Sequence, residues 1–333
     1  MSALTRWVEA VWWSHAAPPW YLQMLTPLYR IINQRNLEQR ARQQQATALP
    51  LISIGNITVG GSGKTPFTLW LAAALQQRGM RPVILCRGDG GKADQPQWVQ
   101  DDSRCEQVGD EAVLLHRSST CPVMTARDRV QACRIIAESG RGDVIILDDG
   151  FQYRQLQRCC DLVMVPAQGV GNGCLLPAGP LREASSALAR ADMIVRSSHH
   201  CYSSKPPNIS DHDEWLWQAL PGVLCDWMEQ GEAAPHNTAL NAITGIARPE
   251  RFFDNLIELG HNIASRHSFA DHYRYTPSDV AALAQLPCPV TTAKDAVKLM
   301  AYWPSDTPLW VLEQTISCDD ALIDAIIAHV PTT

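Results

Sequence analysis

From residue 50 onward, short apolar runs alternate with segments in which apolar residues recur at helical spacing. The runs predict strands over 51–54, 82–86, 122–125, 143–147, 161–165 and 191–196. The helical spacing predicts helices over 65–78 and 128–139, between these strands. Such alternation is typical of an α/β fold in which a mostly parallel sheet carries helices on both faces.

A stretch rich in Ser, His and Pro over 197–207 indicates a loop or linker. After it the alternation returns, with strands expected over 242–245, near Ile263, over 289–292 and over 309–313. Helices are expected over 249–259, from Thr276, over 295–303 and over 319–329. We therefore expect an N-terminal helical segment over 1–45, a first α/β domain over 46–200 and a smaller second α/β domain over 201–333.

The first 45 residues follow a different pattern, in which aromatic residues crowd an amphipathic segment. Helical spacing relates Trp7, Val8, Val11 and Trp12, and a second stripe consists of Leu22, Leu25, Leu28, Tyr29 and Ile32. Pro27 is expected to kink or limit this second helix. The basic residues Arg30, Arg35, Arg40 and Arg42 follow. The combination is typical of a helix lying in the headgroup layer of a membrane, and the alternative is a helix packed on its own domain.

Composition narrows the function classes. The chain has 28 basic and 34 acidic residues, a net charge of −6, and no basic excess that would indicate nucleic-acid binding. Its 11 cysteines include no C-x-x-C pair, so neither a disulfide framework nor a zinc ribbon is predicted. No run approaches the roughly 20 apolar residues of a membrane span, and the start does not resemble a signal peptide. A cytoplasmic protein is expected.

The strongest local signal follows the strand over 51–54 and opens the next helix. It reads Thr58, Val59, Gly60, Gly61, Ser62, Gly63, Lys64, Thr65. In such a P-loop, backbone N–H groups cradle phosphates, the lysine reaches the outer phosphates and the threonine hydroxyl holds Mg²⁺. Thr58 stands where the usual pattern has glycine. Asp148 and Asp149 end a later strand, where carboxylates can hold Mg²⁺ directly or through water.

Among P-loop proteins, a kinase is favoured over a GTPase switch. No Asn-Lys-x-Asp guanine-binding motif is present, and Leu147 stands where a switch would have its aspartate. Phosphate transfer to an alcohol requires a proton acceptor and cations that neutralise the transferred group. The candidates are Asp110, Glu111 and Arg129, together with a Gly- and Pro-rich loop over 171–183 that ends in Arg182 and Glu183. Each could also be a helix cap, a surface ion pair or a turn.

Taken together and in order, these motifs resemble the tetraacyldisaccharide 4′-kinase family, the lipid A kinases of Gram-negative bacteria. The resemblance rests on the extended P-loop over 55–66, Arg87-Gly88, Gly109-Asp110-Glu111, Asp148-Asp149-Gly150-Phe151-Gln152 and the loop over 171–183. Segments over 245–253, 269–272 and 294–298 are similar to later family motifs. Asp89, Tyr153 and Ala293 depart from the family's usual Tyr, His and Glu.

The resemblance implies an activity, cofactors and partners. A P-loop NTPase-like domain would transfer the γ-phosphate of ATP, with Mg²⁺, to the 4′-hydroxyl of a tetraacylated glucosamine disaccharide 1-phosphate, forming lipid IVA. The enzyme would be peripheral on the cytoplasmic face of the inner membrane. Neither a nucleic acid nor an obligatory protein partner is implied.

The resemblance also implies residue roles. Residues 58–65 would bind the nucleotide, with Lys64 at the phosphates, and Thr65, Asp148, Asp149 and Glu183 would surround the metal. Asp110 would accept the hydroxyl proton, with His272 of the second domain as its dyad partner. Arg182, Arg129 and Glu111 would complete the wall of the site.

Two other function classes remain open at the level of the sequence. One is a P-loop kinase for a soluble sugar or nucleoside, with the N-terminal aromatic residues packed inside. The other is a non-enzymatic membrane-binding module that binds ATP without transferring phosphate.

Overall fold

The computed structural model describes residues 3–14, 16–198, 214–228, 238–246, 248–271 and 273–331. Its first lobe is built on seven strands: β1 (Leu51–Gly55), β2 (Pro82–Cys86), β3 (Gln97–Trp98), β4 (Val123–Thr125), β5 (Val144–Asp148), β6 (Cys160–Val165) and β7 (Met193–Ser197). All pair in parallel except β3, which runs antiparallel to β4. Every residue of β1, β2 and β5 is buried.

Helices cover both faces of this sheet, as the sequence predicted. Those of the first lobe are α3 (Lys64–Gln77), α4 (Cys105–Val108), α5 (Asp110–Arg117), α6 (Arg129–Ser139) and the 3₁₀ helix η1 (Ser185–Arg190). Phe67 of α3 packs on one face with Ile54, and Ile136 of α6 packs on the other with Leu51. The two faces arise because residues an odd number of positions apart in a strand point to opposite sides. The short elements β3 and α4, and helix α5, had no predicted counterpart.

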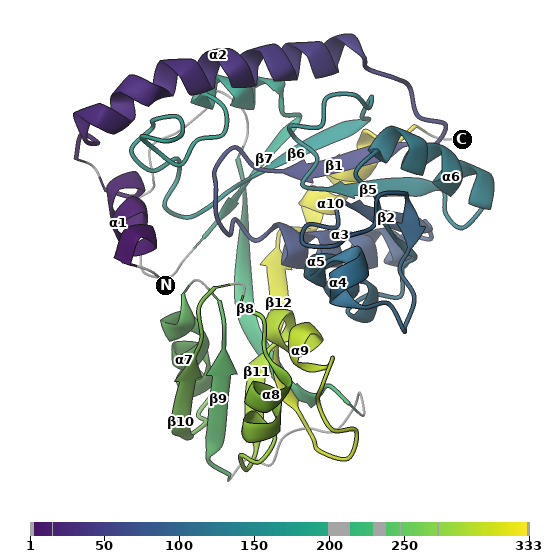
Figure 1. Ribbon diagram of the computed structural model, residues 1–333. Coiled ribbons are helices and arrows are strands. Elements are labelled where there is room, and N and C mark those ends of the chain that lie inside the picture. The colour runs from purple at the N-terminus through teal and green to yellow at the C-terminus, as the bar shows by residue number, and fades with distance from the viewer. Residues whose placement is uncertain are drawn as a thin grey trace.

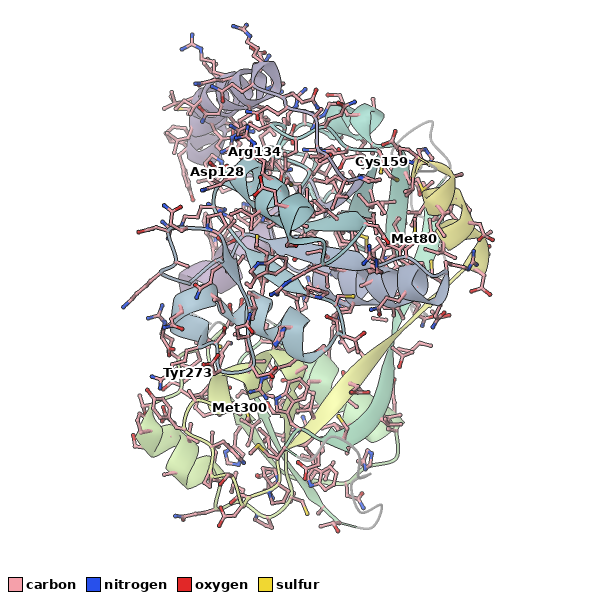
Figure 2. All side chains as sticks on the ribbon, turned by 90° about the vertical axis from the view of Figure 1, so that its right-hand side faces the viewer. Met80, Asp128, Arg134, Cys159, Tyr273 and Met300 are labelled. Atoms are coloured by element: carbon pink, nitrogen blue, oxygen red, sulfur yellow. The ribbon has the colours of Figure 1, made fainter. Side chains whose placement is uncertain are left out.

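The second lobe contains β9 (Leu240–Thr244), β10 (Ile263–Ser268) and β11 (Pro289–Thr292), with α7 (Pro249–Glu258), α8 (Pro277–Leu283) and α9 (Ala293–Leu299). All six were predicted, with bounds shifted by a few residues. Figure 1 shows this lobe below the first, and Figure 2 places Tyr273 and Met300 in it, away from Asp128 and Arg134.

An antiparallel ribbon joins the lobes into one sheet. It consists of β8 (Glu214–Asp226) and β12 (Trp310–Cys318). β8 pairs with β7 of the first lobe, and β12 pairs with β11 of the second. In the described residues the strand order is β10-β9-β11-β12-β8-β7-β6-β1-β5-β2-β4-β3. β8 was not predicted, because Pro221 and Gly222 interrupt its sequence pattern.

The last helix, α10 (Asp320–Ala328), returns to the first lobe. Leu322, Ile323 and Ile326 are buried in the same cluster as Phe67 of α3. The sequence division at residue 200 stays a prediction. The C-terminal helix completes the core that α3 covers in the first lobe. Figure 1 shows α10 among the elements of that lobe.

The N-terminal segment forms α1 (Ala3–Trp12) and α2 (Trp20–Arg42). α2 continues through Pro27, so of the two predicted effects of this proline, a kink or an end of the helix, the second does not occur. Its outward side chains are each at least 47% exposed: Trp20, Tyr21, Met24, Leu25, Leu28, Ile31 and Ile32. Tyr29, expected in that apolar stripe, instead faces the first lobe. The helix does pack on its own lobe, but with its apolar stripe turned away from it.

None of the helices in the described ranges is both long enough and apolar enough to span a bilayer.

We expect Ile326→Ala to destabilise the protein by about 2–5 kcal/mol, because it leaves a cavity between α10 and α3. Asp324→Ala on the same helix removes only an exposed ion pair with Arg78 and is expected to cost no more than about 1 kcal/mol. Urea unfolding of both variants measures the difference. Equal losses would mean that α10 is not part of the first-lobe core.

Candidate functional site

The P-loop spans the turn between β1 and α3, as predicted. Gly63 directly precedes α3 and has a left-handed backbone, with φ of +79°. A side chain there would collide with the indole ring of Trp217, which β8 places against the loop. The amide of Asn56 donates to the Ser62 hydroxyl at 2.9 Å and ties the two ends of the loop together. The backbone N–H groups at the start of α3 are therefore held in position to bind an anion.

Parallel pairing of β1 with β5 places the aspartate pair beside the P-loop. Ile54 is the register partner of Asp148, so the two strands end together. Lys64 reaches across to Asp149, with 3.3 Å between Nζ and Oδ1. Arg182 approaches the same carboxylate from the 171–183 loop, at 3.2 Å and 3.3 Å from the two oxygens. Three of the predicted site residues thus form one charge cluster.

The pKa values of the two carboxylates are shifted in opposite directions because their surroundings differ. Burial alone would raise the pKa of Asp149, but Lys64 and Arg182 together hold it below its usual value. Asp148 is only 3% exposed, and burial raises its pKa despite the nearby Lys64. Asp149 also adopts a left-handed backbone, with φ of +50°. This conformation is uncommon for residues other than glycine, and residues that adopt it are concentrated at functional sites.

These oxygens fit a magnesium ion. Asp148 has one oxygen bonded to the Thr68 hydroxyl at 3.0 Å, and its buried charge is compensated only in part by Lys64. In the described part of the chain no three His, Cys, Asp or Glu side chains form a preformed metal cluster. Mg²⁺ commonly uses one or two carboxylates together with waters and substrate phosphates, so a two-aspartate site suits it.

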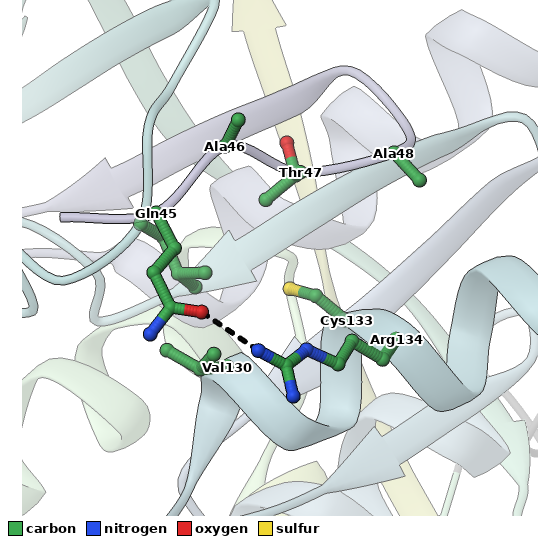
Figure 3. Close-up of a pocket in the computed structure, with 8 residues that line it drawn as sticks. Gln45, Ala46, Thr47, Ala48, Val130, Cys133 and Arg134 are labelled. Atoms are coloured by element: carbon green, nitrogen blue, oxygen red, sulfur yellow. Dashed lines mark hydrogen bonds between the residues drawn. The ribbon is translucent and has the colours of Figure 1, made fainter.

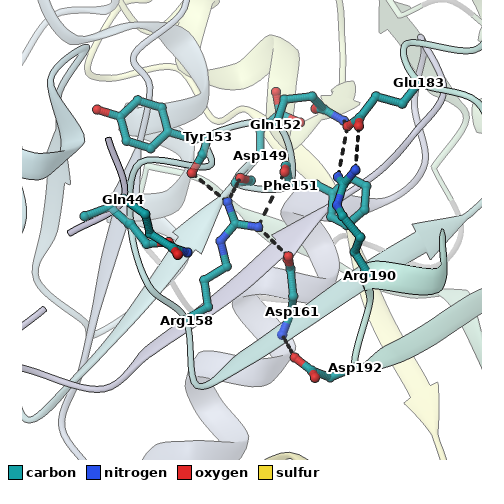
Figure 4. Close-up of polar contacts among 12 residues, drawn as sticks. Gln44, Asp149, Phe151, Gln152, Tyr153, Arg158, Asp161, Glu183, Arg190 and Asp192 are labelled. Carbon is teal, nitrogen blue, oxygen red and sulfur yellow. Dashed lines mark hydrogen bonds and ion pairs between the residues drawn. The ribbon is translucent and has the colours of Figure 1, made fainter. Parts of the chain in front are cut away.

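The segment after the aspartate pair is held from beneath by Arg158, a residue that the sequence did not single out. Its guanidinium donates to the carbonyl groups of Gly150 at 3.0 Å and Tyr153 at 2.6 Å, and pairs with Asp161 (Figure 4). An arginine has five donors in a rigid fork, so one side chain can fix a whole turn. This network keeps Asp149 at the end of β5.

Glu183 lies beside this segment and is 5% exposed. Its two oxygens accept from Arg190 at 2.8 Å and 3.3 Å, and one also accepts from Gln152 at 3.2 Å (Figure 4). Gln152 in turn donates to the carbonyl of Asn56, in the P-loop segment, at 2.8 Å. The metal role of Glu183 stays a prediction; in this structure its carboxylate joins the segment over 150–153 to η1.

Arg129 opens α6 and is 3% exposed. Its guanidinium donates to the Asp149 carbonyl at 3.2 Å and lies 4.8 Å from the centre of the Tyr153 ring. Its backbone N–H donates to the Tyr153 hydroxyl at 3.0 Å. Tyr153, which departs from the family's usual His, therefore holds Arg129 in place.

Asp110 and Glu111 begin α5. From the sequence we expected these two residues in a loop that enters an apolar segment. Burial, followed by the charge of Asp148, raises the pKa of Glu111, which places it in the electrostatic field of Asp148. The same field includes Lys64 and, from the second lobe, Lys294. His272, the predicted partner of Asp110, lies outside the described residues.

A cleft of about 430 Å³ opens between this charge cluster and α2. Twelve residues line it, among them five arginines and a single carboxylate, that of Asp149. The arginines are Arg40, Arg87, Arg127, Arg129 and Arg182. Of these five arginines, the sequence predicted only Arg129 and Arg182 in the wall of the site. A smaller cavity of about 40 Å³ lies behind α6, where Arg134 donates to Gln45 at 2.8 Å (Figure 3).

Comparison with known proteins gives one consistent result. The family model for tetraacyldisaccharide-1-P 4′-kinase matches residues 18–331. The chain is 36% identical to tetraacyldisaccharide 4′-kinases of Aeromonas hydrophila and Methylobacillus flagellatus, with 96% and 98% of this chain and 95% and 97% of those proteins covered. A crystal structure of LpxK from Aquifex aeolicus in complex with ATP superposes with a TM-score of 0.79 at 26% identity, covering 93% of this chain and 98% of that one.

We expect Gly63→Ala to destabilise the protein by at least about 1 kcal/mol, because alanine resists the left-handed backbone and its methyl group meets Trp217. Gly61→Ala is the matched control, since a methyl group there meets nothing within 4 Å. Urea unfolding without nucleotide compares the two. A Gly63→Ala protein as stable as Gly61→Ala would contradict the contact between β8 and the P-loop.

Proposed function

This chain belongs to the tetraacyldisaccharide-1-P 4′-kinase family, and we propose that the charge cluster of Lys64, Asp149 and Arg182 is where it transfers phosphate from ATP to the 4′-hydroxyl of a tetraacylated glucosamine disaccharide 1-phosphate. The observation that carries the proposal is the meeting of these three side chains beside the P-loop, at 3.2–3.3 Å. A lysine, an arginine and a metal-binding carboxylate are the groups that phosphate transfer requires.

The residues divide the work of the transfer. Backbone N–H groups of residues 60–65 and the Lys64 ammonium hold the phosphates of ATP. Thr65, Asp148 and Asp149 would hold Mg²⁺, which would neutralise phosphate charge. Arg182 and Arg129 stabilise the negative charge that spreads over the transferred group.

Asp110 accepts the proton of the attacking hydroxyl. The 4′-oxygen forms its bond to the γ-phosphorus as the bond from that phosphorus to the bridging oxygen of ADP breaks, and ADP leaves. His272 would be hydrogen-bonded to Asp110 as its dyad partner and would orient it. The partner of this base comes from the other lobe. The site would therefore be completed when the two lobes, which β8 and β12 join, close on each other.

The arginine-lined cleft supports an anionic acceptor. Arg40, Arg87 and Arg127 lie on its wall together with Arg129 and Arg182. Arg87 and Arg127 are each about 60% exposed and pair with the exposed Asp89 and Asp94. Such exposed ion pairs contribute little stability, so a phosphate group can replace the carboxylates.

The exposed stripe of α2 supports a position on the membrane surface. Seven large apolar side chains face away from the lobe, and the exposed Arg30, Arg35 and Arg42 of the same helix can meet lipid phosphates. An acylated acceptor stays in the bilayer, so the enzyme would bind peripherally to the cytoplasmic face of the inner membrane. The proposal requires neither a nucleic acid nor a protein partner.

We expect Asp110→Asn to lower kcat by about 10²- to 10⁴-fold with ATP binding unchanged, because the base acts on the acceptor alone. The assay follows labelled γ-phosphate into the acceptor in mixed micelles with Mg²⁺. Asp102→Asn, an equal charge change at an exposed position, should retain full activity. Unchanged kcat in Asp110→Asn would remove Asp110 from the role of base, and no transfer by the unaltered protein would point to a soluble acceptor or a non-enzymatic module.

We expect the double variant Leu25→Glu, Leu28→Glu to bind vesicles of phosphatidylethanolamine and phosphatidylglycerol at least about tenfold more weakly, because two apolar side chains no longer enter the lipid. Both residues are more than half exposed, so folding should be unaffected. Vesicle sedimentation measures binding. Gln34→Glu adds charge to an exposed position of the same helix and serves as the control. Equal binding by all proteins would argue against a lipid-facing α2.

A further inference from the structure

α2 contacts the active site through a row of residues opposite its apolar stripe. Tyr29, Asn33, Leu37 and Arg40 are spaced so that they share one face of the helix. Leu37 is buried, and Arg40 donates to the carbonyl of Gln152 at 3.2 Å. The apolar stripe of α2 faces outward. The hydrogen-bond donors of the same helix therefore face inward, toward the residues that follow Asp148 and Asp149.

Two of these donors meet on a single atom. The Tyr29 hydroxyl donates to the backbone oxygen of Arg182 at 3.0 Å, and the Asn33 amide donates to the same oxygen at 2.7 Å. A carbonyl oxygen has two lone pairs, so these two bonds use its full capacity. Burial raises the pKa of Tyr29, which keeps its hydroxyl protonated as a donor.

The other side of the Arg182 backbone is bound to the P-loop segment. Its N–H donates to the carbonyl of Ile57 at 2.7 Å, and the neighbouring Val59 N–H donates to the carbonyl of Pro180 at 2.8 Å. Arg182 is thus held between α2 and the nucleotide loop, while its guanidinium reaches Asp149. Removing either side of this clamp leaves the backbone of a charged catalytic group free to shift.

We propose that Tyr29 and Asn33 are positioning residues, which hold the Arg182 guanidinium at the transferred phosphate by fixing its carbonyl. This inference rests on the proposed function of Arg182. It makes the lipid-facing helix part of the active site, so that the residues that bind the bilayer and those that align the catalytic arginine belong to one rigid element.

The test is a double-mutant cycle of kcat at saturating ATP and acceptor. Tyr29→Phe removes one hydroxyl and should lower kcat about fivefold, and Asn33→Ala should lower it about tenfold, with the KM for ATP changed less than twofold. Asn33→Asp keeps the shape but replaces the donor with an acceptor, so it should lose at least as much as Asn33→Ala. In an Arg182→Ala background each substitution should change kcat less than twofold, because the residue through which it acts is absent.

Gln34→Ala is the matched control, since its side chain bonds only to exposed Glu38 on the same helix. It should change kcat less than twofold in both backgrounds. Vesicle binding and the unfolding midpoint should be unchanged in every variant of Tyr29 and Asn33, which separates positioning from a loss of folding or of membrane contact.

Hydrogen exchange of the Arg182 amide gives a readout that does not depend on activity. We expect it to quicken at least threefold in Asn33→Ala and not in Gln34→Ala, because the segment over 180–182 loses one of its two anchors. Unchanged exchange, or losses in kcat that persist in the Arg182→Ala background, would overturn the inference. If exchange is faster in Asn33→Ala but the unaltered protein transfers no phosphate, the proposed function is overturned instead.

Discussion

The parallel pairing of β1 with β5 is the constraint on which the site depends. Because parallel strands end at the same edge of a sheet, the loop that follows β1 and the carboxylates that end β5 must meet there. Lys64, at the start of α3, then lies within 3.3 Å of Asp149. A slip of one residue in this register would turn Asp148 to the opposite face of the sheet and separate its carboxylate from the P-loop.

Charge in the site is balanced by neighbours, some of them close in the sequence and some far apart. Asp149 is offset by Lys64 and Arg182, Glu183 by Arg190, and Asp161 by Arg158. A buried charge without such a partner would be strongly destabilising, so each pair also restricts where its segment can lie. The same interactions that make the charges tolerable therefore align the groups that act on phosphate.

α2 has an arrangement opposite to that of an ordinary surface helix. Its apolar side chains face outward, and its polar side chains contact the lobe through hydrogen bonds to backbone oxygens. A helix of this kind is favourable only where something other than water covers the apolar stripe. Its contacts with Arg182 and Gln152 place the apolar stripe within a few residues of the charge cluster of Lys64, Asp149 and Arg182.

The sequence by itself determined the alternation of strands and helices, the P-loop and the aspartate pair, because these depend on local periodicity and on residue types at fixed spacing. It also identified Arg129, Arg182 and Glu111 as members of a wall without saying what each touches. Only the tertiary structure decided that β8 and β12 unite two lobes in one sheet, that α10 returns to the first lobe, and that Tyr29 turns inward. Those outcomes depend on contacts between residues far apart in the chain, and a pattern that repeats every two or four residues carries no information about which distant surface it will meet.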